Sequence, residues 1–153
     1  MSPQAGLQQA REDDLSAVLV LWEEAGVTPP SATDSIEGLS GLLKEPAAIL
    51  LVAWLDDRIV GSVIGGWDGW RGNIYRLTVT PEYRRRGIAR QLVAKVSRAL
   101  FDKDAWRLSA LVEHEHRWAI DFWDSRRDLG YERDPKFVRY TADRTAQKPV
   151  GKR

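Results

Sequence analysis

The chain has 153 residues, 29% of them charged, and its 23 lysines and arginines against 22 aspartates and glutamates leave a formal net charge of +1. This length allows one domain with a hydrophobic core, and the balanced charge creates no field that would draw the protein to nucleic acid or to a membrane. The absence of cysteine excludes disulfides, thiolate catalysis and cysteine-ligated metal. No apolar run has the length of a membrane span or a secretory signal, so we expect a cytoplasmic protein.

Hydrophobic periodicity predicts strands and helices in alternation. In chain order we predict a strand over 6–10, helices over 13–25 and 34–44, strands over 47–55, 58–65 and 73–79, a helix over 87–101, a strand over 106–112, a helix over 118–129 and a strand over 136–140. Antiparallel strands followed by βαβ units indicate an α/β fold with a mixed sheet flanked by helices. Residues 143–153 are polar and basic, so we expect a flexible tail after a single domain over 1–142.

Residues 77–92 are the most informative segment. The strand runs into Pro81, Arg84–Arg86 precede Gly87, and an amphipathic helix follows. A helix start leaves N–H groups without partners and carries partial positive charge, so this turn can hold a phosphate group. Gly87 and Ala89 are small where a diphosphate would approach the backbone. The segment predicts a site for a diphosphate-bearing cofactor, and a solvated arginine surface or a nucleic-acid patch is the alternative reading.

The order of strand, Val79-x-Pro81, Arg84-x-x-Gly87-x-Ala89 and helix resembles the GNAT N-acetyltransferase superfamily over roughly residues 7–140. Residues 119–132, Ala-x-x-Phe-Trp followed by Leu-Gly-Tyr-Glu, are similar to a later segment of that family, and residues 65–72 resemble a loop of a small bacterial subgroup. The resemblance implies a mostly antiparallel twisted sheet, in which the strands over 73–79 and 106–112 are parallel and splayed. It also implies acetyl-CoA as the acyl donor, with pantetheine in the splay.

Several cofactor contacts follow from this resemblance. The main chain of Leu77, Thr78 and Val79 would bond pantetheine, and the amide of Leu77 or Val79 would polarise the thioester carbonyl. The pyrophosphate would lie on the amides of residues 85–89, supported by the side chains of Arg84 and Arg90. His116 replaces an asparagine, and Trp123 replaces a tyrosine, of many family members. The predicted cofactor-binding residues are Leu77, Thr78, Val79, Arg84, Arg85, Arg86, Gly87, Ile88, Ala89, Arg90, His116 and Trp123.

The general base is less clearly marked. Asn73 stands where some family members have a glutamate, and an amide cannot accept a proton at neutral pH. Direct attack by an amine needs mainly positioning and carbonyl polarisation. We expect Glu113 or Tyr75 to act as a base through water, with Tyr75 on the strand face of Leu77 and Val79. Each could instead be a solvated or wall residue.

Further candidate bases are His114, Tyr83 and Tyr131. His114 and His116 lie two residues apart, as two ligands on one strand face would, but no third ligand is evident. We therefore expect no metal, and we interpret His116 as a polar contact to pantetheine.

Acceptor-side residues are expected in the glycine-rich loop over 66–72 and near the first two helices. Asp68 could hold an ammonium group, and tryptophan rings could cover a cation. Alternatively, Asp68-Gly69 forms a turn and the tryptophans pack on the core. The predicted acceptor-side residues are Trp22, Asp34, Trp67, Asp68 and Trp70.

The sequence thus predicts transfer of acetyl from acetyl-CoA to a primary amine, on a small molecule or a protein, by direct attack. We expect no membrane or nucleic-acid partner, and homodimers are frequent among similar proteins. Two alternatives stay open. One is a non-catalytic, regulatory CoA-binding module, which Asn73 and Trp123 allow. The other is a nucleic-acid-binding protein that uses Arg84–Arg86.

Overall fold

The computed structural model describes residues 4–27 and 33–144. Contacts along the chain divide it into two compact units, Met1–Glu113 and His114–Arg153. Most of the tail predicted over 143–153 lies outside the described residues.

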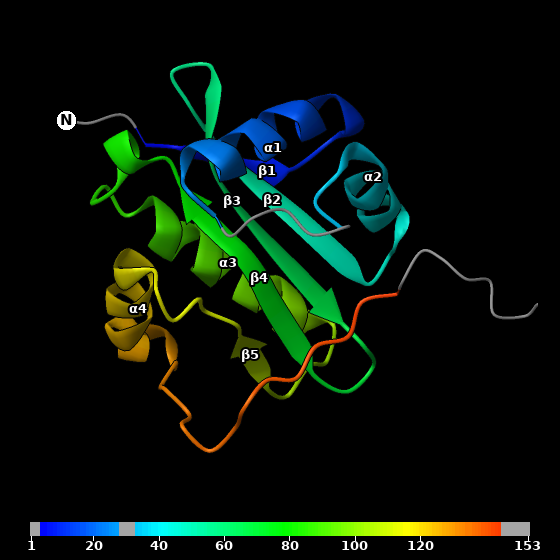
Figure 1. The fold of residues 1–153 in the computed structure, drawn as a ribbon, viewed down its shortest axis with the longest axis vertical. Helices are drawn as coiled ribbons and strands as arrows, with labels where there is room; N and C mark the ends of the chain where they lie inside the picture. Colours follow the sequence, from blue (N-terminus) through cyan, green and yellow to red (C-terminus); the bar gives the residue numbers. More distant parts are fainter. Residues whose placement is uncertain (1–3, 28–32, 145–153) are drawn as a thin grey trace, which may run out of the picture. The chain divides into compact units, whose positions relative to one another are not determined.

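The first unit is built on a five-stranded sheet (Figure 1). The sheet has the order β1-β2-β3-β4-β5, in which the first four strands pair antiparallel and β5 pairs parallel with β4. The strands are β1 (Gly6–Gln9), β2 (Ala48–Leu55), β3 (Arg58–Trp67), β4 (Gly72–Val79) and β5 (Leu108–Ala110). This arrangement confirms the predicted mixed and mostly antiparallel sheet.

The β2–β3 hairpin follows closely from the sequence. The apolar run of β2 is buried along nearly its whole length, as expected for a strand covered on both faces. Asp56 and Asp57 make the turn with φ angles of +52° and +58°, and two successive left-handed residues suit a two-residue hairpin. Trp67 belongs to β3, so the loop before β4 is shorter than predicted and comprises residues 68–71.

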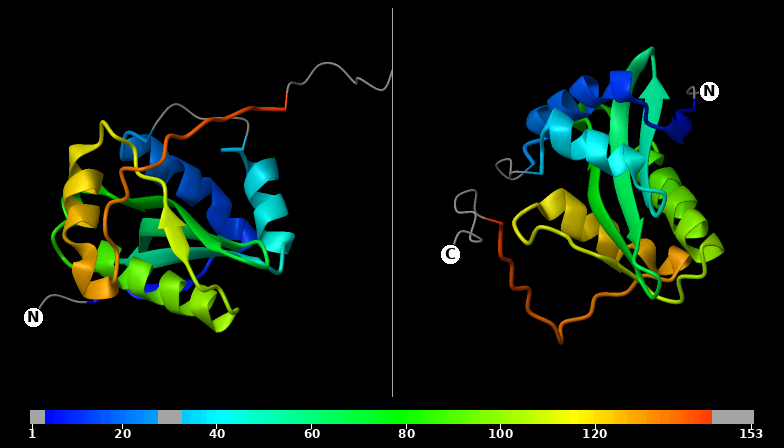
Figure 2. Two further views of the ribbon diagram at one scale, coloured as in Figure 1. Left: turned by 90° about the horizontal axis from the view of Figure 1, so that it is seen from below. Right: turned by 90° about the vertical axis from the view of Figure 1, so that its right-hand side faces the viewer.

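Helices cover the two faces of the sheet, as both views of Figure 2 show. They are α1 (Leu15–Glu24) and α2 (Ile36–Lys44) on one face and α3 (Ile88–Asp102) on the other. The Trp22 indole of α1 donates to the Ser62 hydroxyl at 2.9 Å, which places Ser62 on the α1 face. A Cβ atom at Gly61 or Gly65 would contact α3 instead. Neighbouring residues of β3 therefore face different helices.

The second helix starts slightly later than predicted. Ser35 caps α2 with its hydroxyl, which accepts from the Gly38 amide at 3.0 Å, and this is the usual role of serine at a helix start. Asp34 consequently precedes the helix, and its side chain can contact the sheet.

β4 contains a bulge that the sequence analysis did not predict. Ser62 pairs with Thr78 and Ile64 pairs with Tyr75, so three steps along β4 match two steps along β3. Arg76 lies in this bulge and has a φ angle of +53°. Because side chains alternate along a strand, one extra residue reverses the faces on one side of it. Tyr75 therefore shares its face with Thr78.

In the second unit, the predicted helix over 118–129 is broken in two. α4 (Arg117–Asp124) ends at Ser125, and a 3-10 turn (Arg126–Leu129) follows. The Ser125 hydroxyl donates to the Asp121 carbonyl at 3.0 Å, a local bond that competes with regular helix geometry. Gly130 ends the segment with a φ angle of +90°, in agreement with the predicted stop.

Two predicted strands need correction. The strand over 136–140 is wrong: Asp134 accepts from the Lys136 amide in a turn, and the described residues offer this segment no paired strand. Its apolar side chains, Phe137 among them, are mostly exposed. The strand over 106–112 shrinks to β5, and Trp106 is almost fully exposed. Alternating apolar residues indicate a strand only where a neighbouring strand pairs with them.

Candidate active site

The turn between β4 and α3 presents unbonded main-chain amides. A short 3-10 turn (Pro81–Tyr83) follows Thr80, and the chain enters α3 through Gly87. Gly87 has a φ angle of +81°, and no side chain caps the helix there. The first bond of α3 runs from the Gln91 amide to the Gly87 carbonyl at 3.0 Å. In the described part of the chain we find no acceptor for the amides of residues 85–89.

The space in front of Gly87 is open, because apart from its neighbours in the chain no atom lies within 4 Å of the position that a Cβ would take. Ile88 and Ala89 bury their side chains, so they contribute to this site through their amides. Open space beside the amides of a helix start suits a phosphate group, since the partial charge of the helix favours an anion. The residues present therefore fit the pyrophosphate that the sequence predicts.

The pairing of β4 with β5 ends well before β4 does. The register runs from Gly72 opposite Leu108 to Ile74 opposite Ala110, and a longer contact of 3.4 Å joins the Leu111 amide to the Ile74 carbonyl. β4 continues to Val79 without β5 beside it. This opening between two parallel strands agrees with the predicted splay.

The main-chain N–H and C=O groups of Thr78 and Val79, the last two residues of β4, point in different directions. The Thr80 amide donates to the Val60 carbonyl at 2.9 Å, and bonding directions alternate along an antiparallel pair. Thr78 therefore bonds toward β3, whereas Val79 points away from it. The prediction that the main chain of Thr78 bonds pantetheine is therefore wrong, and Val79 is the residue whose main chain faces away from β3. The contact expected from Leu77 stays a prediction.

The side chain of Arg84 lies against the end of β4. Its Nε donates to the Val79 carbonyl oxygen at 3.1 Å, so a main-chain acceptor predicted for pantetheine is already bonded. Burial lowers the pKa of the Arg84 guanidinium. A side chain predicted to contact phosphate thus also ties the turn to the end of β4.

The other arginines of the turn differ in their contacts. Arg86 lies over the Tyr83 ring with its guanidinium carbon 4.8 Å from the centroid, and Arg58 approaches the same ring at 5.5 Å. The Tyr83 hydroxyl donates to Asp56 at 3.2 Å, so Tyr83 belongs to a surface network. Arg85 is exposed with a φ angle of +65°, and Arg90 is exposed on α3.

The candidate bases lie in different environments. Tyr75 is 39% exposed, and the bulge puts it on the α1 face rather than on the face expected from simple alternation with Leu77 and Val79. That part of the prediction is wrong because the pleat is interrupted. Glu113 is partly buried just after β5, at the end of the first unit, and Asn73 pairs with Ser109.

The remaining candidates lie in the second unit. Trp123 meets the Tyr131 ring edge-on at 5.0 Å and the Phe122 ring at 5.5 Å. His116 precedes α4 without capping it through its side chain, and His114 is exposed. These facts describe an aromatic cluster, and the roles of His116 and Trp123 toward a cofactor stay predictions.

The structure joins two predicted acceptor-side residues through Arg76. Nη2 of Arg76 donates to Oδ2 of Asp34 at 2.5 Å, and the guanidinium carbon lies 5.2 Å from the centroid of the Trp22 ring. Sequence reasoning missed Arg76. The only available signal was a charged residue in the middle of an otherwise apolar strand.

The loop over 68–71 is a compact turn. The Asp68 carboxylate accepts from the amides of Trp70 and Arg71, both at 2.9 Å. These two bonds lower the pKa of Asp68, and the bond from the Arg71 amide has the larger effect. Trp70 is 67% exposed, with the Arg71 guanidinium carbon 4.2 Å from its ring centroid. The turn-forming alternative thus describes Asp68 well, but Trp70 does not pack on the core as that alternative expected. The cation over the Trp70 ring is the protein's own Arg71, so a role of this ring toward an acceptor stays a prediction.

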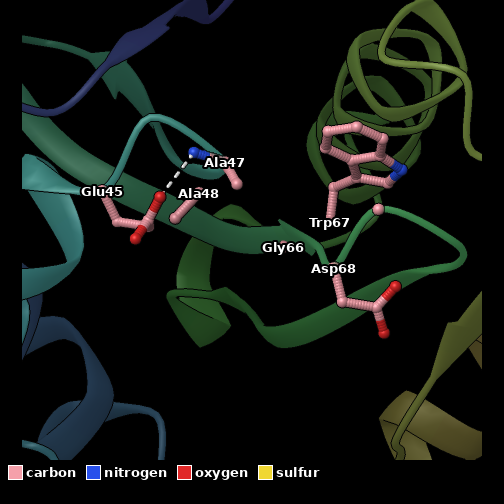
Figure 3. A pocket seen from close by; sticks show the side chains of 7 residues that line it. Glu45, Ala47, Ala48, Gly66, Trp67 and Asp68 are labelled. Carbon is pink, nitrogen blue, oxygen red and sulfur yellow. Dashed lines mark hydrogen bonds between the residues drawn. The ribbon is translucent and has the colours of Figure 1, made fainter.

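A pocket of about 480 Å³ lies beside this loop (Figure 3). Trp67 and Asp68 extend to different sides of the chain, and the Glu45 carboxylate accepts from the Ala47 amide at 3.1 Å. The pocket lies by the start of β4, whereas the amide turn follows its end. The predicted acceptor-side residues therefore fall into two groups. The pocket is lined by Glu45, Ala47, Ala48, Gly66, Trp67, Asp68 and Gly69.

Comparison with known proteins agrees with this geometry. The acetyltransferase (GNAT) family matches residues 7–131. An acetyltransferase of Pectobacterium atrosepticum is 33% identical over 122 residues, which cover 80% of this chain and 84% of the relative. The chain belongs to the GNAT acetyltransferase family.

Solved structures show the same fold at low sequence identity. The PaiA N-acetyltransferase of Thermoplasma acidophilum, in complex with coenzyme A, has a TM-score of 0.72 at 15% identity over 81% of this chain and 89% of its own. An aminoglycoside acetyltransferase from an uncultured soil sample, in complex with sisomicin, has a TM-score of 0.73 at 19% identity over 92% and 97%.

Two kinds of feature are absent from the residues that the structure describes. No helix there has the length and apolarity to cross a bilayer. No group of three or more histidine, aspartate or glutamate side chains there could hold a metal ion.

Proposed function

We propose that this protein transfers an acetyl group from acetyl-CoA to a primary amine by direct attack, and that the single domain predicted over residues 1–142 is the catalytic domain. One observation carries the proposal: β4 loses its parallel neighbour after Ile74, and the turn after β4 presents unbonded amides. The opening can take an extended chain and the amides can take a diphosphate, in the order in which CoA carries them. Family membership supports the same donor.

Each part of the site has its own task in this proposal. The amides of residues 85–89 bind the pyrophosphate, and Gly87 allows its close approach. The Val79 amide, which points away from β3, and the Leu77 amide offer donors to the pantetheine arm and the acyl carbonyl. When bound, acetyl-CoA supplies a thioester as the acyl donor. Fixed donors near the carbonyl stabilise the negative charge that develops during attack.

Proton removal is assigned to Glu113 through water. It is the carboxylate nearest in sequence to the end of β5, next to the point where the two strands separate. An amine must be neutral to attack, so a base that keeps it neutral increases the rate. The turnover experiment does not depend on this assignment.

The test combines binding and turnover. Calorimetry with CoA measures the affinity of the amide turn, and release of the CoA thiol from acetyl-CoA is followed with a panel of amino acids, polyamines, aminoglycosides and peptides. Mass spectrometry then identifies the acetylated product. An N-acetylated amine supports the proposal.

Two other results would reject it. CoA binding without any acetylated product would favour the non-catalytic module. Absence of CoA binding, together with strongly salt-dependent binding to nucleic acid, would favour the arginine patch of Arg84–Arg86 as the functional surface.

A further inference from the structure

The main chain of Arg76 is held firmly in an unusual conformation. Its φ angle of +53° is uncommon for a residue with a side chain. The Arg76 carbonyl oxygen accepts from the Ser62 hydroxyl at 3.2 Å and from the Thr78 hydroxyl at 3.3 Å, and both of these residues are buried. Backbone strain that buried hydrogen bonds maintain is concentrated at functional sites.

The side chain of Arg76 is fixed as well. It lies between the Trp22 ring and the Asp34 carboxylate, and Trp22 is itself bonded to Ser62. Only 23% of the Arg76 side chain and 9% of the Asp34 side chain are exposed. The guanidinium therefore has one orientation, determined by α1, β3 and the residue before α2.

This guanidinium is only partly used. It carries five N–H donors, and Asp34 accepts from Nη2. No residue that the structure describes accepts from Nε or Nη1 of Arg76. Neither nitrogen is among the fully buried atoms without a partner, so both can be reached from solvent. The free donors thus form a pre-oriented site for an acceptor group with paired oxygens.

We propose that Arg76 binds a carboxylate of the acceptor, so that the amines acetylated here are amino acids or other small carboxylate-bearing amines. This inference rests on the proposed acetyl transfer. Arg76 immediately precedes Leu77, whose amide is expected beside the thioester, so an acceptor held by Arg76 has its amine near the reacting carbon. A planar guanidinium suits a carboxylate better than an ammonium does. Asp34 holds the Arg76 guanidinium in position and leaves the Nε and Nη1 donors of Arg76 available.

The test compares acceptors that differ only in the carboxylate: each amino acid, its amide and its decarboxylated amine. Binding to the protein with CoA bound is measured by calorimetry, and kcat/KM by thiol release. We expect the wild-type protein to bind the acid roughly tenfold more tightly than the amide. Arg76→Ala should abolish this preference while CoA affinity is retained. Arg98→Ala, which removes an exposed arginine of α3, is the matched control and should keep it.

The outcomes separate this inference from the proposed function. Equal binding of acids and amides by the wild-type protein, or a preference that survives Arg76→Ala, would overturn the role of Arg76. If Arg76→Ala lowers CoA affinity, Arg76→Gln, which retains most of the side-chain length, replaces it in the comparison. Acid preference without turnover would reject acetyl transfer only. Acetylation of acids and amides with the same kcat/KM would reject only the carboxylate site.

Discussion

Arg84 and Val79 are joined by a hydrogen bond from the guanidinium Nε to the main-chain carbonyl at 3.1 Å. The bond closes the turn onto the end of β4 and occupies a carbonyl that the family resemblance assigns to pantetheine. The Val79 amide is then the main-chain group that this residue can offer to a cofactor. The same arginine thus stabilises the turn and limits how the edge of β4 is used.

Arg84→Ala should lower both stability and CoA affinity. A hydrogen bond of this kind contributes about 1 kcal/mol to folding, and its loss frees the turn that carries the amides. Arg98→Ala is the matched control, because it removes the same charge from an exposed position of α3 and should change the free energy of unfolding by less than about 0.5 kcal/mol. Denaturant unfolding and calorimetry measure the two effects. Equal losses in the two variants would contradict a specific role for the bond.

Gly87→Ala should weaken CoA binding more than it weakens the fold. An alanine at a φ angle of +81° costs about 1–2 kcal/mol, but its Cβ would meet no protein atom. Gly26→Ala provides the comparison, since Gly26 also has a positive φ, +70°, and open space around it. Both variants should lose similar stability, and only Gly87→Ala should lose CoA affinity. Unchanged affinity would mean that phosphate does not approach this residue.

Glu113→Gln should slow acetylation at pH values where the acceptor amine is protonated and leave CoA affinity unchanged. The substitution keeps the shape of the side chain and removes its ability to accept a proton. The difference from wild type should diminish as rising pH deprotonates the amine without help. A pH–rate profile with an identified acceptor measures this. Identical profiles for the two proteins would exclude Glu113 as the base.

Asp68 should remain ionised below the pH at which an ordinary aspartate is protonated. The Arg71 and Trp70 amides stabilise its carboxylate and lower its pKa in the folded state. The stabilisation is therefore present above the unfolded pKa of about 3.9 and is lost as the pH falls through the lower folded value. NMR titration of these two amides measures the transition, with Asp68→Asn as control. A midpoint at or above the ordinary value would contradict the two bonds.

Trp22 and Ser62 should show strong energetic coupling. Trp22→Phe removes the donor to the Ser62 hydroxyl, and Ser62→Ala leaves the buried indole N–H without its acceptor. Each loss is expected to cost about 1–3 kcal/mol. The loss of unfolding free energy in the double variant should be smaller than the sum of the two single losses, because the double variant contains no buried indole N–H without an acceptor. Additive losses in denaturant unfolding would show that the bond contributes little.

Several elements could be predicted because short-range rules determine them. The apolar run over 47–55 required a buried strand, Asp56-Asp57 required a tight turn, and Gly87 before an amphipathic helix indicated an amide-lined helix start. Each depends on side-chain periodicity or on a backbone preference within a few residues. The amide turn of the candidate site follows from such local features, whereas the predicted contacts with pantetheine depended on the family resemblance.

The strand over 136–140 shows where local rules are insufficient. Its alternation resembles that of a half-buried strand, but a strand forms only with a partner, and the segment pairs with none of the described strands. The same argument applies to the ends of β5, which pairs with β4 over three residues. Pairing is a long-range property, so hydrophobic alternation alone overestimated both strands.

By itself, the amino-acid sequence indicated the family, the order of the elements from β1 to α4 and the turn that can hold a diphosphate, since these depend on neighbouring residues. Only the tertiary structure decided which of the predicted acceptor-side residues meet. The bulge at Arg76 comes from the register between β3 and β4, and it moves Tyr75 to the other face of the sheet. The same register brings Arg76 to Trp22, which is 54 positions earlier in the chain, and to Asp34, which is 42 positions earlier. No local pattern encodes that meeting, because it depends on how α1, α2 and β4 pack together.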